Sequence, residues 1–154
     1  MPPGFGTSGL RGRVSDLTPE LVGSYVTAFV QSCPVGPGLF VARDLRPSSK
    51  RIVDVVTAAA RGRGVAVTDC GTLPTPALAM AAGAAGAAAI MVTGSHIPAD
   101  RNGLKFFTPG GEIGKADEAA ILAARRETPP PPRAPAMLRQ ADPGPDYVAR
   151  YAQA

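Results

Sequence analysis

The chain has 154 residues, with 16 lysines and arginines against 12 aspartates and glutamates, so its formal net charge is +4. This length corresponds to one domain, or to one domain and a short piece of another. Neither an apolar stretch near the ~20 residues that cross a bilayer nor a leader peptide is visible, so we expect a cytosolic protein. The scattered basic residues and few aromatics argue against a nucleic-acid partner and favour a small anionic ligand.

Helical and strand patterns alternate along the first half of the chain. A capping hydroxyl at Thr18, followed by proline and a helical recurrence of apolar residues, predicts a helix over 19–32. The apolar run 38–44 predicts a buried strand that ends in charged residues. Ser48 or Ser49 is expected to cap the next helix, which ends at the glycines after its apolar stripe.

The second half continues this alternation. Thr75 is expected to cap a helix that Pro76 opens and that runs through an alanine-rich stretch. Asn102-Gly103 is expected to form a turn, with the glycine allowing an unusual backbone shape. The other predicted elements are strands over 65–69, 87–92 and 103–108, a turn over 109–111 and a helix over 115–126.

This order of elements predicts an α/β fold, a three-layer α/β/α domain around a mixed, mainly parallel sheet. Its boundaries are expected at 1–127, followed by a proline-rich linker over 128–145 and a helix-like segment over 146–154. Ligands bind such sheets beyond the carboxyl ends of the strands. The stretches 43–49, 69–75 and 93–102, which each follow a predicted strand, are therefore the candidate binding loops.

The segment after the 87–92 strand carries the clearest chemistry. Ser95 is a possible nucleophile or phosphate carrier, and His96, the chain's single histidine, can transfer protons near neutral pH. A serine-hydrolase elbow is excluded because its Gly-x-Ser-x-Gly pattern is missing. Spacing alone leaves a second interpretation equally open, in which Ser95 caps a turn and His96 lies on the surface.

Several motifs together resemble the α-D-phosphohexomutase superfamily, which includes the phosphomannomutases and phosphoglucomutases. Thr93-Gly94-Ser95-His96-Ile97-Pro98 is similar to the family's phosphoserine loop, with Gly94 in place of the usual Ala and Ile97 in place of Asn. Further matching segments, in order, are 5–12, 41–49, 71–76 and 102–106. The resemblance covers about 4–126 and is strongest to phosphomannomutase, and 146–151 is similar to the opening of the family's second domain.

The resemblance implies an enzyme that moves phosphate between the 1- and 6-positions of a hexose through a bisphosphorylated sugar. Ser95 would be the phosphoserine, His96 and Lys105 would take part in proton transfer, and Arg11 would stabilise charge on the transferring group. An ion pair among Arg43, Asp44 and Arg46 that braces the loop is favoured over ligand contact. The residues expected to bind substrate or phosphate, or to brace the loop, are Thr7, Ser8, Arg43, Arg46 and Asn102.

The resemblance also implies Mg²⁺ and a hexose 1,6-bisphosphate as cofactors. Ser95 would contribute to the metal site through its phosphate, but the family's Asp-Gly-Asp-x-Asp-Arg metal loop is not found in this sequence. We therefore expect the catalytic-serine domain plus the start of a second domain, without turnover as an isolated chain. Two alternatives remain: a fragment that binds a phosphosugar or a separately encoded remainder of the enzyme, and an inert, poorly folded fragment. The motifs do not distinguish which hexose phosphate is used.

Overall fold

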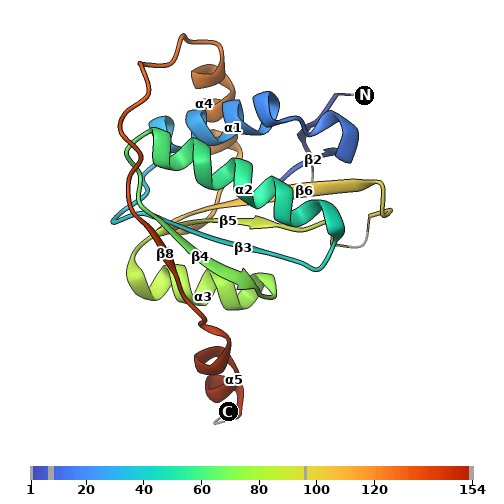
Figure 1. The fold of residues 1–154 in the computed structure, drawn as a ribbon, viewed down its shortest axis with the longest axis vertical. Coiled ribbons are helices and arrows are strands. Elements are labelled where there is room, and N and C mark those ends of the chain that lie inside the picture. The colour runs from blue at the N-terminus through green and yellow to red at the C-terminus, as the bar shows by residue number, and fades with distance from the viewer. Residues whose placement is uncertain (1, 7–8, 96, 153–154) are drawn as a thin grey trace.

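The computed structural model describes residues 2–6, 9–95 and 97–152, which form a sheet between layers of helices (Figure 1). The strands are β1 (Gly4–Phe5), β2 (Leu10–Arg13), β3 (Leu39–Arg43), β4 (Val67–Thr72), β5 (Ala88–Val92), β6 (Arg101–Thr108), β7 (Gly111–Glu112) and β8 (Leu138–Gln140). The helices are α1 (Pro19–Ser32), α2 (Pro47–Gly62), α3 (Thr75–Ala85), α4 (Lys115–Arg125) and α5 (Gly144–Ala152), with a 3-10 turn over Val14–Asp16.

The sheet is mixed, as the sequence predicts. Its order is β1-β2-β6-β5-β3-β4-β8, with β7 paired to β6. The pairings of β3 with β5, β3 with β4 and β4 with β8 are parallel, whereas β6 runs antiparallel to both β5 and β2. The register places Arg43 beside Val92, and Val92 beside Leu104. The carboxyl ends of β3 and β5 therefore lie beside the first half of β6, at the same end of the sheet.

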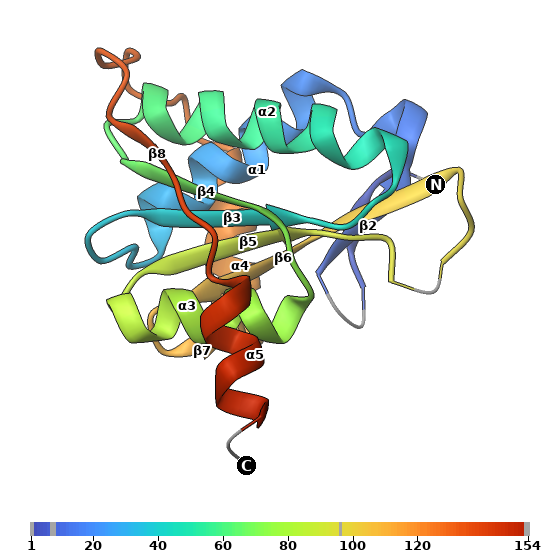
Figure 2. The ribbon, with the colours of Figure 1, turned by 60° about the horizontal axis from the view of Figure 1, so that its bottom comes forward.

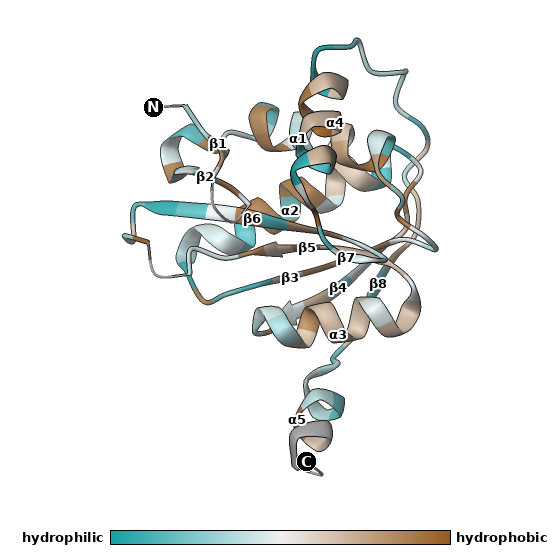
Figure 3. Cartoon of the chain, turned by 180° about the vertical axis from the view of Figure 1, so that it is seen from behind, coloured by the Kyte–Doolittle hydropathy of each residue, from teal (hydrophilic) through white to brown (hydrophobic). Residues whose placement is uncertain are grey.

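Helices cover both faces of the sheet, which confirms the three-layer α/β/α fold. One face packs against α1, α2 and α4 through a cluster that includes Phe29, Ile90 and Phe106, all fully buried. The other face packs against α3 through small side chains such as Ala77 and Ala82. Figure 2 shows α5 leaving the body of the molecule on the α3 side. In Figure 3 the central strands β3 and β5 are hydrophobic, whereas the start of β6 is hydrophilic.

The helix starts follow local chemistry, with two differences from the sequence prediction. Thr18 caps α1 as predicted, with its hydroxyl accepting a hydrogen bond from Leu21 N at 3.2 Å. The predicted serine cap of α2 is wrong: the helix begins at Pro47 after a non-capping Arg46, and the serines bind elsewhere. Helix α3 likewise begins one residue early, with Thr75 inside its first turn.

The remaining differences concern strands formed by polar or glycine-rich segments. The predicted turn at Asn102-Gly103 lies inside β6, because β2 pairs with β6 and extends it back to Arg101. The predicted 128–145 linker is only partly free of regular structure. Its residues Leu138–Gln140 form β8 against β4, and α5 begins at Gly144. Polar and glycine-rich composition concealed both pairings, and β8 is in addition a short strand at the edge of the sheet, where apolar alternation is not needed.

Within the described ranges, no helix combines the length and the apolar character that crossing a bilayer requires.

Candidate active site

The Ser95 loop, defined here as residues 93–100, joins β5 to β6 at the end of the sheet where β3 also ends. Ser95 is exposed and has φ of 49°, the one positive φ among the described residues other than glycine. Such a left-handed conformation costs of order 1–3 kcal/mol and persists only where surrounding contacts enforce it. The loop therefore stores backbone strain at the residue that the sequence analysis singled out.

Asp44, immediately after β3, anchors the start of this loop. One carboxylate oxygen accepts hydrogen bonds from Thr93 Oγ1 at 3.1 Å and Gly94 N at 3.0 Å. The other oxygen accepts from Ser49 Oγ at 2.5 Å and Arg46 N at 3.0 Å. Because both oxygens are engaged, a single side chain ties β3, the start of α2 and the Ser95 loop together.

These contacts also fix the charge state of Asp44. Burial disfavours the carboxylate, but the hydrogen bonds from Ser49, Gly94, Arg46 and Thr93 outweigh burial and lower the pKa of Asp44 below its ordinary value of 3.8. The ionised form is therefore the stable one near neutral pH, and it holds the loop through charge-assisted hydrogen bonds.

Arg46 holds the rest of the loop from the opposite side. Its Nη1 donates to the carbonyls of Pro98 and Arg101 at 2.8 and 3.0 Å, and its Nη2 donates to Ile97 O and Ser95 O at 2.6 and 3.4 Å. Its Nε lies 3.5 Å from the Asp44 carboxylate, and the side chain is 18% exposed. The guanidinium thus contacts three loop carbonyls and the first carbonyl of β6, the geometry that a planar fork of donors suits.

Asn102 supports the loop from inside the molecule. It is fully buried, and its amide nitrogen donates to Ser48 Oγ at 2.8 Å and Ser49 Oγ at 2.9 Å, while its oxygen accepts from Gly103 N at 2.8 Å. A buried amide with all these partners fixes the position of the β6 start relative to α2. Among the two roles expected for Asn102, these contacts correspond to bracing.

The predicted cationic residues fall on two faces of the sheet. Arg11 pairs with Gly103 across β2 and β6, and Lys105 follows two residues later, so both side chains lie on the α3 face. A Cβ at Gly103 would lie 2.7 Å from Leu10 O and 3.2 Å from the Arg11 side chain, so a glycine fits this close approach of β2 to β6. Arg43 pairs with Val92 and shares the opposite, α2-side face. Thr7, Ser8 and His96 lie outside the described residues.

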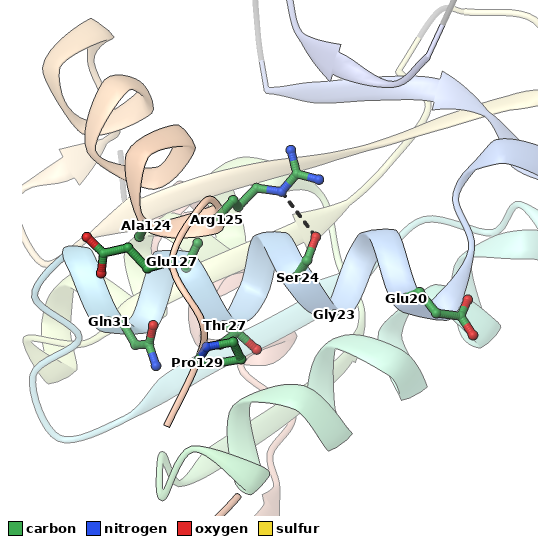
Figure 4. Close-up of a pocket in the computed structure, with 10 residues that line it drawn as sticks. Glu20, Gly23, Ser24, Thr27, Gln31, Ala124, Arg125, Glu127 and Pro129 are labelled. Atoms are coloured by element: carbon green, nitrogen blue, oxygen red, sulfur yellow. Dashed lines mark hydrogen bonds between the residues drawn. The ribbon is translucent and has the colours of Figure 1, made fainter. Parts of the chain in front are cut away.

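Two hollows show where ligands could reach this surface. One of about 660 Å³ lies beside the Ser95 loop, between Arg13, Ser48 and Asp100. Another of about 250 Å³ lies between α1 and the end of α4, near the Arg125–Ser24 hydrogen bond of 3.1 Å (Figure 4). The first is lined by Ala99 and Asp100 of the Ser95 loop, whereas the second shares no lining residue with that loop.

The described part of the chain does not by itself fit Mg²⁺. No three His, Cys, Asp or Glu side chains gather there in a metal-binding group. The Asp44 carboxylate, which contacts the loop backbone, already accepts from protein donors on both oxygens. Mg²⁺ demands an octahedron of oxygen ligands, which this arrangement does not offer.

Comparison with known proteins shows the family of this chain. The model described as "Phosphoglucomutase/phosphomannomutase, alpha/beta/alpha domain I" matches residues 2–129. The chain belongs to the phosphoglucomutase/phosphomannomutase family. A phosphomannomutase of Sinorhizobium fredii is 51% identical over 129 residues, covering 80% of this chain and 27% of the relative. A phosphoglucosamine mutase of Streptococcus pneumoniae is 38% identical over 144 residues, covering 84% of the chain and 31% of the relative.

Solved structures agree with this assignment. A phosphoglucomutase/phosphomannomutase family protein from Burkholderia thailandensis superposes with a TM-score of 0.79 at 28% identity, covering 95% of this chain and 34% of that one. A Paramecium parafusin (phosphoglucomutase) superposes at 0.82 with 18% identity, covering 99% and 36%, which shows the shared fold. The family member described here thus spans about a quarter to a third of the relatives' length.

The sequence did not reveal the extent of the loop's support. The Arg43, Asp44 and Arg46 group was interpreted as a possible brace, and in the structure an ion pair joins Asp44 to Arg46. Asp44 as the common acceptor and Ser49 as its donor were missed, because Ser49 was interpreted as a helix cap. A fully buried serine beside charged residues offers no distinguishing signal in sequence, since its burial depends on the packed fold.

Proposed function

We propose that Ser95 carries a phosphate in an enzyme that interconverts hexose 1-phosphate and hexose 6-phosphate, with phosphomannomutase as the favoured activity. The observation that carries this proposal is the exposed, left-handed Ser95 on a loop that Asp44 and Arg46 hold in place. Strain maintained by polar contacts at an exposed serine is typical of a functional site. Identity of 51% to a phosphomannomutase supports that branch of the family.

The proposed reaction consists of two phosphoryl transfers. In the first, the bond between Ser95 Oγ and phosphorus breaks as a bond forms from a sugar hydroxyl oxygen to phosphorus, giving a hexose 1,6-bisphosphate. The hydroxyl proton passes to a base on the protein, and Ser95 recovers a proton. In the second, Ser95 Oγ bonds to the phosphorus of the other phosphate as the bond from that phosphorus to the sugar oxygen breaks. The Ser95 proton passes to the protein and the sugar oxygen takes up a proton, which regenerates the phosphoserine and releases the isomeric monophosphate.

The chain's own residues would position and stabilise this transfer. Arg11 lies on the sheet face beside Gly103, where a cation suits the negative oxygens of the moving phosphoryl group. Lys105 shares that face, and we propose that it takes part in proton transfer together with His96. A contribution of the Ser95 phosphate to Mg²⁺ binding remains a proposal that rests on the family resemblance.

The test is to locate the phosphate. The full-length protein and the 154-residue chain are each incubated with hexose 1,6-bisphosphate labelled with ³²P, and the labelled peptide is identified by mass spectrometry. We expect label on Ser95 and none in Ser95→Ala, while Ser15→Ala, which removes another exposed serine hydroxyl, keeps the label. Label on a different residue of the full-length protein would overturn the assignment.

A second candidate is binding without turnover. The chain covers only 27% of the S. fredii phosphomannomutase, so the 154 residues alone are proposed to bind a phosphosugar or a separately encoded remainder of the enzyme. Calorimetric titration of the 154-residue chain with mannose 6-phosphate, followed by a turnover assay, distinguishes the two. Binding without product supports this candidate, and steady product formation by the chain alone contradicts it.

A further inference from the structure

We propose that Gly94 and Arg46 form an interlocked pair that positions Ser95, in which the guanidinium occupies its present position because residue 94 has no side chain. A Cβ built at Gly94 would lie 2.1 Å from both Cζ and Nε of Arg46 and 2.6 Å from its Nη1. Contacts this short do not occur, so any side chain at residue 94 would displace the guanidinium. That Ser95 is the reacting group rests on the proposed function; the interlock itself does not.

Backbone conformation does not explain this glycine. Gly94 is absent from the described glycines with positive φ, which include Gly9, Gly36 and Gly71. An alanine could therefore adopt its φ without strain. The space occupied by Arg46 is the remaining explanation for a glycine at this position. It predicts that alanine at residue 94 no longer disturbs the loop once the guanidinium has been removed, which a backbone explanation would not predict.

Arg46 cannot simply move aside. It is anchored by the carbonyls of Ser95, Ile97, Pro98 and Arg101 and by the Asp44 carboxylate. Displacing it would break these contacts together, because the donors belong to one planar group. The loss would fall on the Ser95 loop, whose other backbone hydrogen bonds include those from Ile97 N to Gly94 O at 2.9 Å and from Val14 N to Asp100 O at 2.8 Å.

The same contacts determine the backbone of Ser95. Its N–H donates to Thr93 Oγ1 at 3.0 Å, and Thr93 in turn donates to Asp44, while its carbonyl accepts from Arg46 at 3.4 Å. Ser95 is thus held from Asp44 on its amide side and from Arg46 on its carbonyl side. Releasing the carbonyl side lets the φ of 49° relax, which would turn the hydroxyl away from its present direction.

A double-mutant cycle tests the pair. Gly94→Ala, Arg46→Met and the double variant are compared by hydrogen–deuterium exchange of the 95–101 peptide in the full-length protein. Each single variant is expected to speed exchange about tenfold, as for lost hydrogen bonds to a charged group. The double variant should also exchange about tenfold faster, rather than the roughly hundredfold of independent effects. Gly110→Ala, with its nearest atom 3.6 Å away, and Arg125→Met, which removes a hydrogen bond to Ser24 away from the loop, should leave the peptide unchanged.

Positioning of Ser95 needs a second readout. At saturating bisphosphate, the rate of ³²P transfer to Ser95 should fall at least about tenfold in Gly94→Ala with the half-saturating concentration unchanged within about twofold. Full additivity in the exchange cycle, or unchanged exchange in Gly94→Ala, would overturn the interlock. Normal transfer despite faster exchange would overturn the positioning role. If the wild-type protein takes no label, the proposed function fails, while the exchange cycle still decides the interlock.

Discussion

Replacing Asp44 with asparagine probes the anchor of the Ser95 loop while preserving its shape. The carboxylate accepts from two backbone N–H groups, Arg46 N and Gly94 N, one at each oxygen. An asparagine has one acceptor oxygen, so its NH₂ group must face one of these N–H donors. The hydroxyls of Ser49 and Thr93 can rotate to accept, but a backbone N–H cannot.

The cost follows from these contacts. One partly buried backbone N–H without an acceptor costs about 1–3 kcal/mol. The surviving hydrogen bonds weaken as well, because bonds to an ionised acceptor are roughly twice as strong as neutral ones. We therefore expect Asp44→Asn to lower the free energy of unfolding by about 2–4 kcal/mol at pH 7. For a chain of this size, this corresponds to a Tm lower by roughly 4–16 °C.

Urea denaturation followed by circular dichroism measures this loss. Asp54→Asn is the matched control, because the Asp54 side chain is 62% exposed and pairs only with Lys50 at the surface, so its loss is expected below about 1 kcal/mol. A difference between wild type and Asp44→Asn within about 0.5 kcal/mol would refute the anchoring role.

The effect should also depend on pH. Because folding lowers the pKa of Asp44, its carboxylate contributes stability that is fully present above the ordinary value of 3.8 and is lost as pH falls through the folded value. The gap between wild type and Asp44→Asn should therefore be constant near neutral pH and narrow below about pH 4. A gap that widens on acidification would contradict the assigned direction.

Three further predictions concern the rest of the fold. Burial and, to a smaller extent, the charge of Asp69 raise the pKa of Cys70 to about 11. Native Cys70 should therefore resist iodoacetamide at pH 8 and react after the protein unfolds in urea. Rapid labelling of the native protein would contradict this prediction. Phe106→Ala removes a fully buried ring whose centroid lies 5.0 Å from that of Phe29, and urea denaturation should show a loss of about 3–5 kcal/mol; a loss under about 1 kcal/mol would contradict the packing. Gly36 has φ of 62°, and a Cβ there would lie 2.1 Å from Gly86 O, so Gly36→Ala should destabilise the fold by more than about 1 kcal/mol. Gly83 in α3 has open space around it, so Gly83→Ala should raise the Tm. Equal changes of Tm in the two variants would refute the distinction.

Patterns with strong periodicity were predictable from sequence, and edge pairings were not. Helix α1 was expected over 19–32 and is found there, because Thr18, Pro19 and the apolar stripe all specify the same start. Strands β1 and β2 were missed because they are short and contain glycine, and β2 also contains two arginines. Strand β1 pairs with β2, and the pairing of β2 with β6 depends on residues about 90 positions away. Local composition carries no information on such a partner.

The candidate site shows the same division. The motif around Ser95 identified the family, which the comparisons confirmed. The support beneath it did not follow from the motif. Asp44 accepts hydrogen bonds from both the α2 start and the loop, and Arg46 occupies the space over Gly94. Both contacts depend on how the parallel strands β3 and β5 are aligned, which the sequence does not state. The catalytic prediction for Ser95 itself stays a prediction.

The strand β8 has a mechanical consequence. The proline-rich segment before it is fixed to the end of α2, through hydrogen bonds from Arg133 N to Gly62 O at 2.8 Å and from Ala136 N to Arg61 O at 3.1 Å. The chain then pairs with β4, and even Ala141 N still donates to Asp69 O at 2.9 Å. A pivot for α5 is therefore confined to the few residues before Gly144, and the prolines behave as part of the rigid body instead of as a tether.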